Sequence, residues 1–328
     1  MPRAKRSVLG FVLMLLISAP IPAAAQSATP ATASPTAASG DFADLVDIGG
    51  GRKMYLTCRG EGSPTVILVA GYRDRGDPWS TDLLHPDSGR TMVLPGVATL
   101  TRVCAYDRPG TALDEDTFSR SDPVLQPQTA ADAGADLHAL LAAAIPGPYV
   151  LVGHSYGGLV VRLYASTYPA EVAGLVLVDA LPAVEQFLTP AQWASYQHVL
   201  SQRPAEIADY RDLETIDLAA SAGQMRAAAA AAPLRSLPLV VLTRVRPFDL
   251  PPDLPADFSA EALERAWAAG QAELAALVPG ARHVVATESG HVIQQDQPEL
   301  VIDAIQQVVD AVRDPSTWPT PAAGTPTP

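Results

Sequence analysis

The chain has 328 residues, of which 17% are charged, and its formal net charge at pH 7 is −13. An acidic chain without a run of basic residues is poorly suited to nucleic acid or to anionic membrane surfaces, so we expect neither as a partner. The two cysteines lie in neither a Cys-x-x-Cys nor a Cys/His pattern. We therefore expect no metal site and no redox centre.

The first 25 residues have the order of a secretory signal peptide. Three basic residues among the first six precede an apolar stretch over 8–17, and alanines occupy 23–25. This order is typical of exported proteins, and the stretch is too short to span a bilayer. We expect cleavage after Ala25 and a secreted or periplasmic protein, with no stable membrane span after cleavage. An uncleaved membrane anchor is the alternative.

Low-complexity sequence flanks the rest of the chain. Residues 26–40 are rich in Ala, Ser, Thr and Pro, and residues 315–328 are rich in Pro, Thr, Ala and Gly. Such segments lack the apolar side chains of a packed core, so we expect a flexible linker and a flexible tail. The region between them, 41–314, is long enough for one substantial α/β domain.

Strand and helix patterns alternate along this region. Short apolar or alternating runs predict strands over 42–48, 52–58, 65–70, 102–106, 149–153, 174–179, 237–242 and 282–286. Helical spacing predicts helices over 128–144, 259–277 and 298–312, with one more after residue 155. Strands separated by helices favour an α/β fold with a mostly parallel, doubly wound sheet.

The fifth predicted strand runs into the motif G-x-S-x-G around Ser155. Gly153 and Gly157 flank the serine, and the following residues continue as a helix. A strand-to-helix turn this tight strains the central residue and leaves no room for neighbouring side chains. The pattern predicts that Ser155 is a catalytic nucleophile, and an ordinary glycine-rich turn is the alternative.

With this motif, four others make the chain resemble the alpha/beta-hydrolase fold superfamily over 41–314. They are Val69-Ala70-Gly71-Tyr72, Tyr106-Asp107-Arg108-Pro109-Gly110, Leu175-Val176-Leu177-Val178-Asp179, and Ser289-Gly290-His291 followed by Asp296-Gln297-Pro298-Glu299. The resemblance implies an eight-stranded, doubly wound, mostly parallel sheet with a helical lid insertion at about 181–236. It also makes the second and fourth strands neighbours, which implies a disulfide between Cys58 and Cys104. Two buried free thiols are the alternative.

The resemblance implies a catalytic triad. A serine hydroxyl needs an imidazole to take its proton, and His291, in a tight turn before the last helix, is in the place of that base. The usual place for the acid follows the seventh strand, where this chain has Arg244 and Arg246. We favour Asp179, at a strand end, and keep Asp249 as the alternative acid.

The resemblance assigns the oxyanion hole to the backbone N–H groups of Tyr72 and Tyr156. Many family members have a histidine where this chain has Ala70, but the donors are backbone groups, so activity does not require that histidine. Asp107 and Arg108 are expected to brace the surrounding loops. The resemblance implies no metal and no organic cofactor.

The insertion at 181–236 is rich in alanine and carries the aromatic residues Phe187, Trp193, Tyr196 and Tyr210. These predict a pocket for a small or medium hydrophobic acyl group, or simply the packing of the lid on the core. We expect a secreted carboxylesterase acting on small-molecule esters through an acyl-enzyme. The alternatives are amide, lactone or carbon–carbon bond hydrolysis, and a ligand-binding sensor with vestigial hydrolysis.

Overall fold

The computed structural model describes residues 40–250, 254–255 and 257–318. The predicted signal peptide, the predicted linker up to residue 39 and the predicted tail from residue 319 lie outside the described residues. None of the helices in the described ranges is both long and apolar enough to cross a bilayer.

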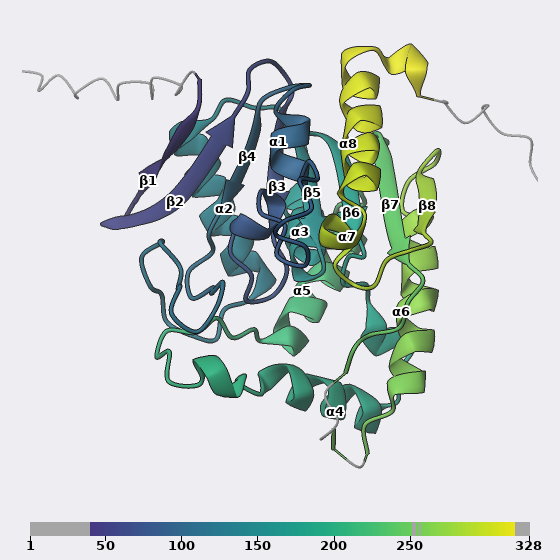
Figure 1. Ribbon diagram of the computed structural model, residues 1–328. Helices are drawn as coiled ribbons and strands as arrows, with labels where there is room; N and C mark the ends of the chain where they lie inside the picture. Colours follow the sequence, from purple (N-terminus) through teal and green to yellow (C-terminus); the bar gives the residue numbers. More distant parts are fainter. Residues whose placement is uncertain (1–39, 251–253, 256, 319–328) are drawn as a thin grey trace, which may run out of the picture. The chain divides into compact units, whose positions relative to one another are not determined.

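Eight strands form one open sheet in the order β1-β2-β4-β3-β5-β6-β7-β8 (Figure 1). β2 is antiparallel to both of its neighbours, and all other neighbouring strands are parallel. The predicted eight-stranded, mostly parallel sheet is therefore confirmed. The strands are β1 (Phe42–Gly49), β2 (Arg52–Arg59), β3 (Thr65–Val69), β4 (Val103–Tyr106), β5 (Tyr149–His154), β6 (Val172–Val178), β7 (Leu239–Arg244) and β8 (Arg282–Ala286).

Helices cover both faces of the sheet. Along β3, Ile67 and Val69 face one apolar core, while Val66 and Leu68 face the other, as the alternation of strand side chains requires. The first core contains α2, α3 and α6, and the second contains α1 and α8. The α-helices are α1 (Val93–Val97), α2 (Ala130–Ala144), α3 (Tyr156–Thr167), α4 (Pro190–Ser201), α5 (Leu218–Ala231), α6 (Ala260–Ala275), α7 (Ile293–Asp296) and α8 (Pro298–Arg313). Short 3-10 helices are η1 (Asp77–Trp79), η2 (Val184–Gln186), η3 (Ala205–Ile207) and η4 (Pro315–Thr317).

Local sequence determines where several helices begin. At α2, the Thr129 side chain accepts a hydrogen bond from the N–H of Asp132, and the Asp132 carboxylate accepts one from the N–H of Thr129. This capping box satisfies two otherwise unpaired donors. Thr189 and Gln192 make the same arrangement at α4, where Pro190 is the first helical residue.

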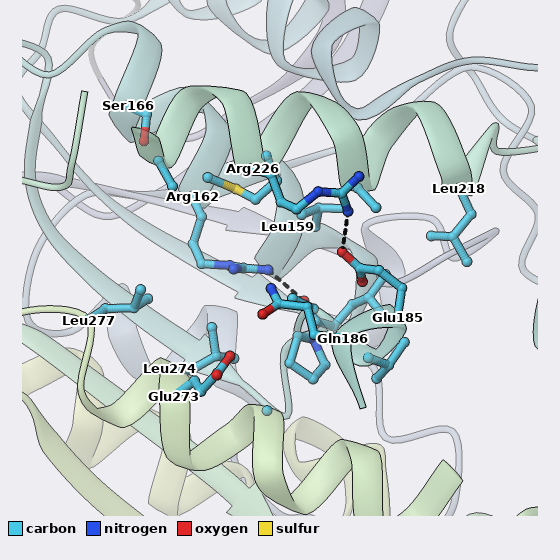
Figure 2. Close-up of a pocket in the computed structure, with 18 of the residues that line it drawn as sticks. Leu159, Arg162, Ser166, Glu185, Gln186, Leu218, Arg226, Glu273, Leu274 and Leu277 are labelled. Atoms are coloured by element: carbon cyan, nitrogen blue, oxygen red, sulfur yellow. Dashed lines mark hydrogen bonds and ion pairs between the residues drawn. The ribbon is translucent and has the colours of Figure 1, made fainter. Parts of the chain in front are cut away.

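The segment between β6 and β7 is a helical insertion. It contains η2, α4, η3 and α5, and α5 packs against α2 and α3. In Figure 1, α4 is seen below the strands. Figure 2 shows a cavity that is lined by residues of this insertion, α3 and α6.

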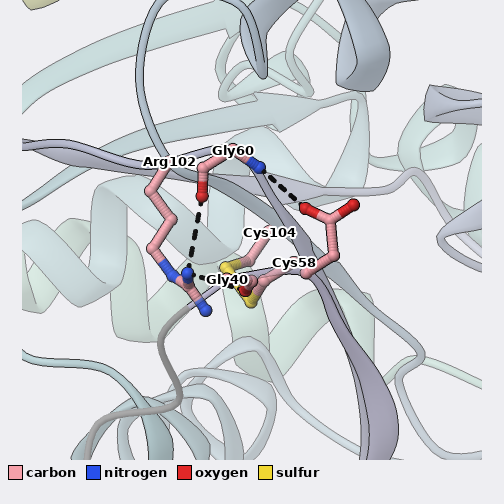
Figure 3. Close-up of a disulfide and its surroundings, with 6 residues drawn as sticks. Gly40, Cys58, Gly60, Arg102 and Cys104 are labelled. Carbon is pink, nitrogen blue, oxygen red and sulfur yellow. Dashed lines mark hydrogen bonds between the residues drawn. A yellow bond between two sulfur atoms is a disulfide. The ribbon is translucent and has the colours of Figure 1, made fainter.

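A disulfide joins Cys58 to Cys104, which are directly opposite each other on β2 and β4 (Figure 3). The predicted pairing is therefore confirmed. Nearby, Nη1 of Arg102 donates to the carbonyl of Gly40 at 2.9 Å, which ties the start of the described chain to this region.

Packing contacts continue past residue 315, where composition alone indicated a tail. η4 packs against α8, and the ring of Trp318 lies under the Arg282 guanidinium, with 4.1 Å between the guanidinium carbon and the ring centroid. An aromatic ring stacked on a cation explains why the contacts extend to Trp318.

Candidate active site

Ser155 occupies a strained turn between β5 and α3. Its backbone angles are φ 49° and ψ −120°, a region that residues with a side chain rarely adopt. A Cβ atom on Gly153 would collide with the backbone of Gly157, and one on Gly157 would collide with that of Val69. The glycines of the motif are therefore required by close backbone approach.

The backbone of Ser155 is held on both sides. Its N–H donates to Val178 at 3.2 Å, and its carbonyl accepts from the N–H groups of Gly158 at 2.9 Å and Leu181 at 2.8 Å. These bonds tie the turn to the end of β6 and to the start of the insertion. The strain is thus supported by neighbouring structure.

His291 lies in the loop between β8 and α7. Its Nδ1 is 2.6 Å from Oδ2 of Asp179. A carboxylate only accepts hydrogen bonds, so this contact places the proton on Nδ1 and leaves Nε2 free to accept one. The ring is bordered by Phe248 and Trp267, with centroids 4.9 and 5.5 Å away.

Asp179 follows β6 and is fully buried, with a positive φ of 38°. Its Oδ1 accepts from Nε1 of Trp267 at 3.1 Å. Nε of Arg244, at the end of β7, lies 3.2 Å from its Oδ2. A buried carboxylate needs such partners, because an unpaired buried charge is strongly unfavourable.

Asp249, the alternative acid, is not a hydrogen-bond partner of His291 in the described part of the chain. It is exposed, and within the described residues it makes no hydrogen bond or ion pair. The hydrogen bond to His291 comes from Asp179 instead. The arginine that stands where an acid was expected, Arg244, contacts that same carboxylate and also pairs with Glu264 at 2.9 Å.

Ser155 and His291 line the same cavity, which has a volume of about 270 Å³. Within the described residues, the Ser155 hydroxyl makes no hydrogen bond with His291. Such bonds are often long in free enzymes and shorten when substrate binds. The rest of the lining is mostly apolar. It comes from the end of β5, the loop after β3, α4, the segment after β7, α6 and the loop after β8: Gly71, Tyr72, Asp74, His154, Tyr196, Val199, Leu200, Phe248, Leu250, Phe258, Leu263, Trp267 and Val292.

The Gly71–Tyr72 peptide is oriented by Arg108. The guanidinium donates to the carbonyl oxygens of Ala70 at 2.8 Å and Gly71 at 2.5 Å. In a trans peptide the C=O and N–H point in opposite directions, so the N–H of Tyr72 points away from Arg108. Tyr156 is the first residue of α3, where N–H groups have no partner within the helix. Among the described residues, neither N–H has a protein acceptor.

Glu214, in the insertion, anchors Arg108. Its carboxylate lies 2.6 Å from Nε of Arg108 and accepts the N–H of Arg73 at 2.6 Å. Both charged side chains are buried. Although burial opposes the charged form, Glu214 raises the pKa of Arg108 above its usual value. The pair fixes the insertion to the loop that carries Tyr72.

Two titratable groups in the cavity were not expected from the sequence. Burial, followed by the nearby His291, lowers the pKa of His154 well below its usual value. Nε2 of this neutral imidazole donates to the carbonyl of His291 at 2.9 Å, and it therefore supports the loop. Burial also raises the pKa of Asp74 to about 6.

Sequence patterns gave little indication of these supporting residues. His154 directly precedes the serine and belongs to no catalytic pattern, yet its ring lies beside that of His291, with centroids 4.8 Å apart. Trp267 lies in a correctly predicted helix, but its contact with Asp179 depends on how that helix packs. Glu214 lies between η3 and α5, and no motif marks it.

The residues described offer no group of three or more His, Cys, Asp or Glu side chains suited to a metal ion. The groups brought together are instead a strained serine, an imidazole and a buried carboxylate. Together these groups can activate a hydroxyl for attack on a carbonyl carbon.

The chain is similar to known proteins in sequence. The sequence model of the alpha/beta hydrolase family matches residues 66–304 of this chain. The Escherichia coli protein named "Putative carbamate hydrolase RutD" is 32% identical over 120 residues, covering 36% of this chain and 38% of that protein. The chain spans less than half the length of this and the other curated relatives that it matches.

Two solved structures have a similar fold. Carboxylesterase CesB from Bacillus subtilis aligns with a TM-score of 0.51 and 17% identity over 82% of this chain and 91% of that chain. Est816, described as an N-acyl homoserine lactone degrading enzyme, aligns with a TM-score of 0.52 and 17% identity over 80% of this chain and 99% of that chain. At this identity the likeness concerns the fold alone.

Proposed function

Because the chain belongs to the alpha/beta hydrolase family, we propose that it is a serine hydrolase that cleaves carboxylic esters. Ser155 is the nucleophile, His291 is the general base, and Asp179 is the carboxylate that orients His291. The main support is the 2.6 Å contact between Nδ1 of His291 and Asp179, in the cavity that Ser155 lines.

The proposed reaction has two acyl-transfer steps. Nε2 of His291 takes the proton of the Ser155 hydroxyl as its oxygen attacks the ester carbonyl carbon. The carbonyl oxygen becomes an oxyanion, which accepts hydrogen bonds from the N–H groups of Tyr72 and Tyr156. When the carbon–oxygen bond breaks, His291 gives its proton to the departing alcohol. Water then attacks the acyl-enzyme in the same way and releases the acid.

Asp179 maintains the base in its reactive form. Its carboxylate accepts the Nδ1 proton, so Nε2 remains available, and its negative charge stabilises the imidazolium formed during attack. Trp267 and Arg244 hold the carboxylate in position. Asp249 has no comparable support.

The cavity supports a small or medium hydrophobic acyl group. Its volume is about 270 Å³, and aromatic and aliphatic side chains from α4 and α6 form much of its wall. The relatives are described as carboxylesterase, lactone-degrading enzyme and carbamate hydrolase. Lactone, amide and carbon–carbon bond hydrolysis remain alternatives that need the same catalytic groups.

A ligand-binding sensor is the alternative outside enzymology. The feature that favours it is the lack of an acid directly after the seventh predicted strand, where Arg244 and Arg246 stand. The contact between Asp179 and His291 weighs against it, because a binder has no need of an oriented base beside a strained serine. We therefore favour catalysis.

We propose export as the destination of the chain. The support is the order of basic, apolar and small residues over 1–25, together with the disulfide between Cys58 and Cys104. Disulfides persist in oxidising compartments and are rare in the reducing cytosol.

A fluorophosphonate probe and p-nitrophenyl esters of several chain lengths test the proposed activity. We expect covalent labelling and turnover in the wild type, and loss of both in Ser155→Ala. The series of chain lengths would rank the acyl preference. Labelling without turnover would favour a sensor or another substrate class. Absence of labelling in a folded protein would contradict the proposed nucleophile.

A further inference from the structure

A second cavity, of about 220 Å³, lies between the insertion, α3 and α6. It shares no lining residue with the cavity that contains Ser155. Its location is therefore independent of the proposed chemistry.

Most of its wall is apolar. The side chains come from α3, the start of the insertion, α5 and α6, and include Leu159, Leu181, Val184, Leu218, Met225 and Leu274. Concave sites with mostly apolar walls and a few polar groups are typical of small-molecule binding.

Arg162 is a buried charged group within this wall. It is only 5% exposed, and Figure 2 shows its guanidinium reaching into the cavity between Leu159 and Gln186. Nε donates to the carbonyl of Gly158 at 3.1 Å, and Nη2 donates to that of Leu181 at 2.6 Å. Nη1 makes no hydrogen bond within the described residues, so donors of the guanidinium remain available.

Arg162 forms no direct ion pair with a carboxylate of the described residues. Within the described ranges no Asp or Glu oxygen lies within 4.0 Å of it. Burial lowers its pKa to about 10, although the negative charge of Glu185 in the same wall opposes this shift, so Arg162 stays charged at neutral pH. A buried charge without a counter-ion is unfavourable, and a bound anion would relieve that cost.

The other charged groups of the cavity are placed differently. Glu185 and Arg226 form an ion pair at 2.6 Å, as Figure 2 shows, and they neutralise each other. Glu273 is exposed to solvent. The buried, unpaired charge in this wall is therefore positive.

We propose that this cavity binds a medium-chain monocarboxylate, with its carboxylate on Arg162 and its hydrocarbon chain along the apolar wall. A planar guanidinium donates two parallel hydrogen bonds to a carboxylate, which matches this head group better than an alcohol or an ammonium. The occupant is thus a monoanionic amphiphile.

Calorimetric titration of the full chain with octanoate, octan-1-ol and octylamine tests the proposal. We expect octanoate to bind, octan-1-ol to bind more weakly and octylamine not to bind. In Arg162→Gln the affinity for octanoate should fall about 10- to 100-fold, in keeping with the loss of a charged hydrogen bond. Equal affinity for all three head groups, or no binding of octanoate, would overturn the proposal.

A pair of cavity-filling variants identifies which cavity is occupied. Ala222→Trp fills the second cavity, and Leu200→Trp fills the cavity of Ser155. Octanoate binding should be lost in the first and retained in the second. The reverse result would place the ligand beside Ser155 and refute the proposal. If Arg162→Gln fails to fold, the three head groups still show whether a carboxylate is required, and these two variants still show which cavity binds it.

Discussion

At the residue scale, the two candidate acids differ in what their carboxylates contact: Asp179 is buried against His291, whereas Asp249 is exposed. Ser155 and His291 lie in short motifs that carry their own local geometry. The acid depends on tertiary contact, so two aspartates remained possible. The structure brings Asp179 to His291 because β6 and β8 end at the same edge of the sheet, with β7 between them.

We expect Asp179→Asn to lower kcat by about 10³- to 10⁴-fold, because an amide no longer favours the tautomer that leaves Nε2 free. Asp249→Asn is the matched control and should leave kcat nearly unchanged. Steady-state kinetics with a p-nitrophenyl ester, supported by circular dichroism to verify folding, measures both. A severe loss in the control and none in Asp179→Asn would move the assignment to Asp249.

The raised pKa of Asp74 makes the free energy of unfolding depend on pH. Burial raises its pKa from 3.8 to about 6, so the folded state holds a proton that the unfolded state has released in that interval. Stability therefore falls as pH rises from about 4 to about 6. Asp74→Asn avoids this loss and should be more stable than the wild type by up to about 3 kcal/mol at pH 8, with the gain vanishing below about pH 4.

Urea unfolding at pH 4, 6 and 8 measures this difference. The exposed Asp87 provides the control, because Asp87→Asn should change the free energy of unfolding little at any of these pH values. A gain in Asp74→Asn that is the same at all three values would show that ionisation is not its cause.

At the element scale, prediction was best for strands and for helices with clear start signals. The continuous apolar runs of β3 and β5 and the capping box of α2 can be read locally. In the insertion, a capping box marks the start of α4, but the alanine-rich sequence of α5 lacks a distinct apolar face that would mark the limits of that helix. Its attachment through Glu214 is a long-range contact that no local pattern encodes.

We expect Glu214→Gln to lower the free energy of unfolding by about 3–5 kcal/mol, because it leaves the buried charge of Arg108 without its counter-ion. It should also lower kcat more than it changes KM, because Arg108 orients the peptide that carries the N–H of Tyr72. Urea unfolding and ester kinetics measure these effects.

Glu206→Gln is the control for this variant. Glu206 is exposed in η3, which lies in the same insertion, and the substitution is again Glu to Gln. If both variants unfold at the same urea concentration, the buried pair does not secure the insertion.

At the scale of the whole molecule, the disulfide joins two cysteines that are 46 residues apart in sequence. We expect no free thiol when the denatured, unreduced protein is titrated. The double variant Cys58→Ala/Cys104→Ala should lower the free energy of unfolding by about 4 kcal/mol on the loop-closure model. Two titratable thiols would contradict the bond, and an unchanged unfolding midpoint would contradict its contribution to stability.

The position of β1 at the sheet edge has a consequence for self-association. An edge strand presents backbone groups that another chain can extend into a continuous sheet. Along β1, the exposed Asp44 and Asp47 use their carboxylates to accept the N–H groups of Leu45 and Gly49. Two copies meeting at this edge would bring like charges together and find these donors already occupied. The same aspartates therefore act as gatekeepers against aggregation.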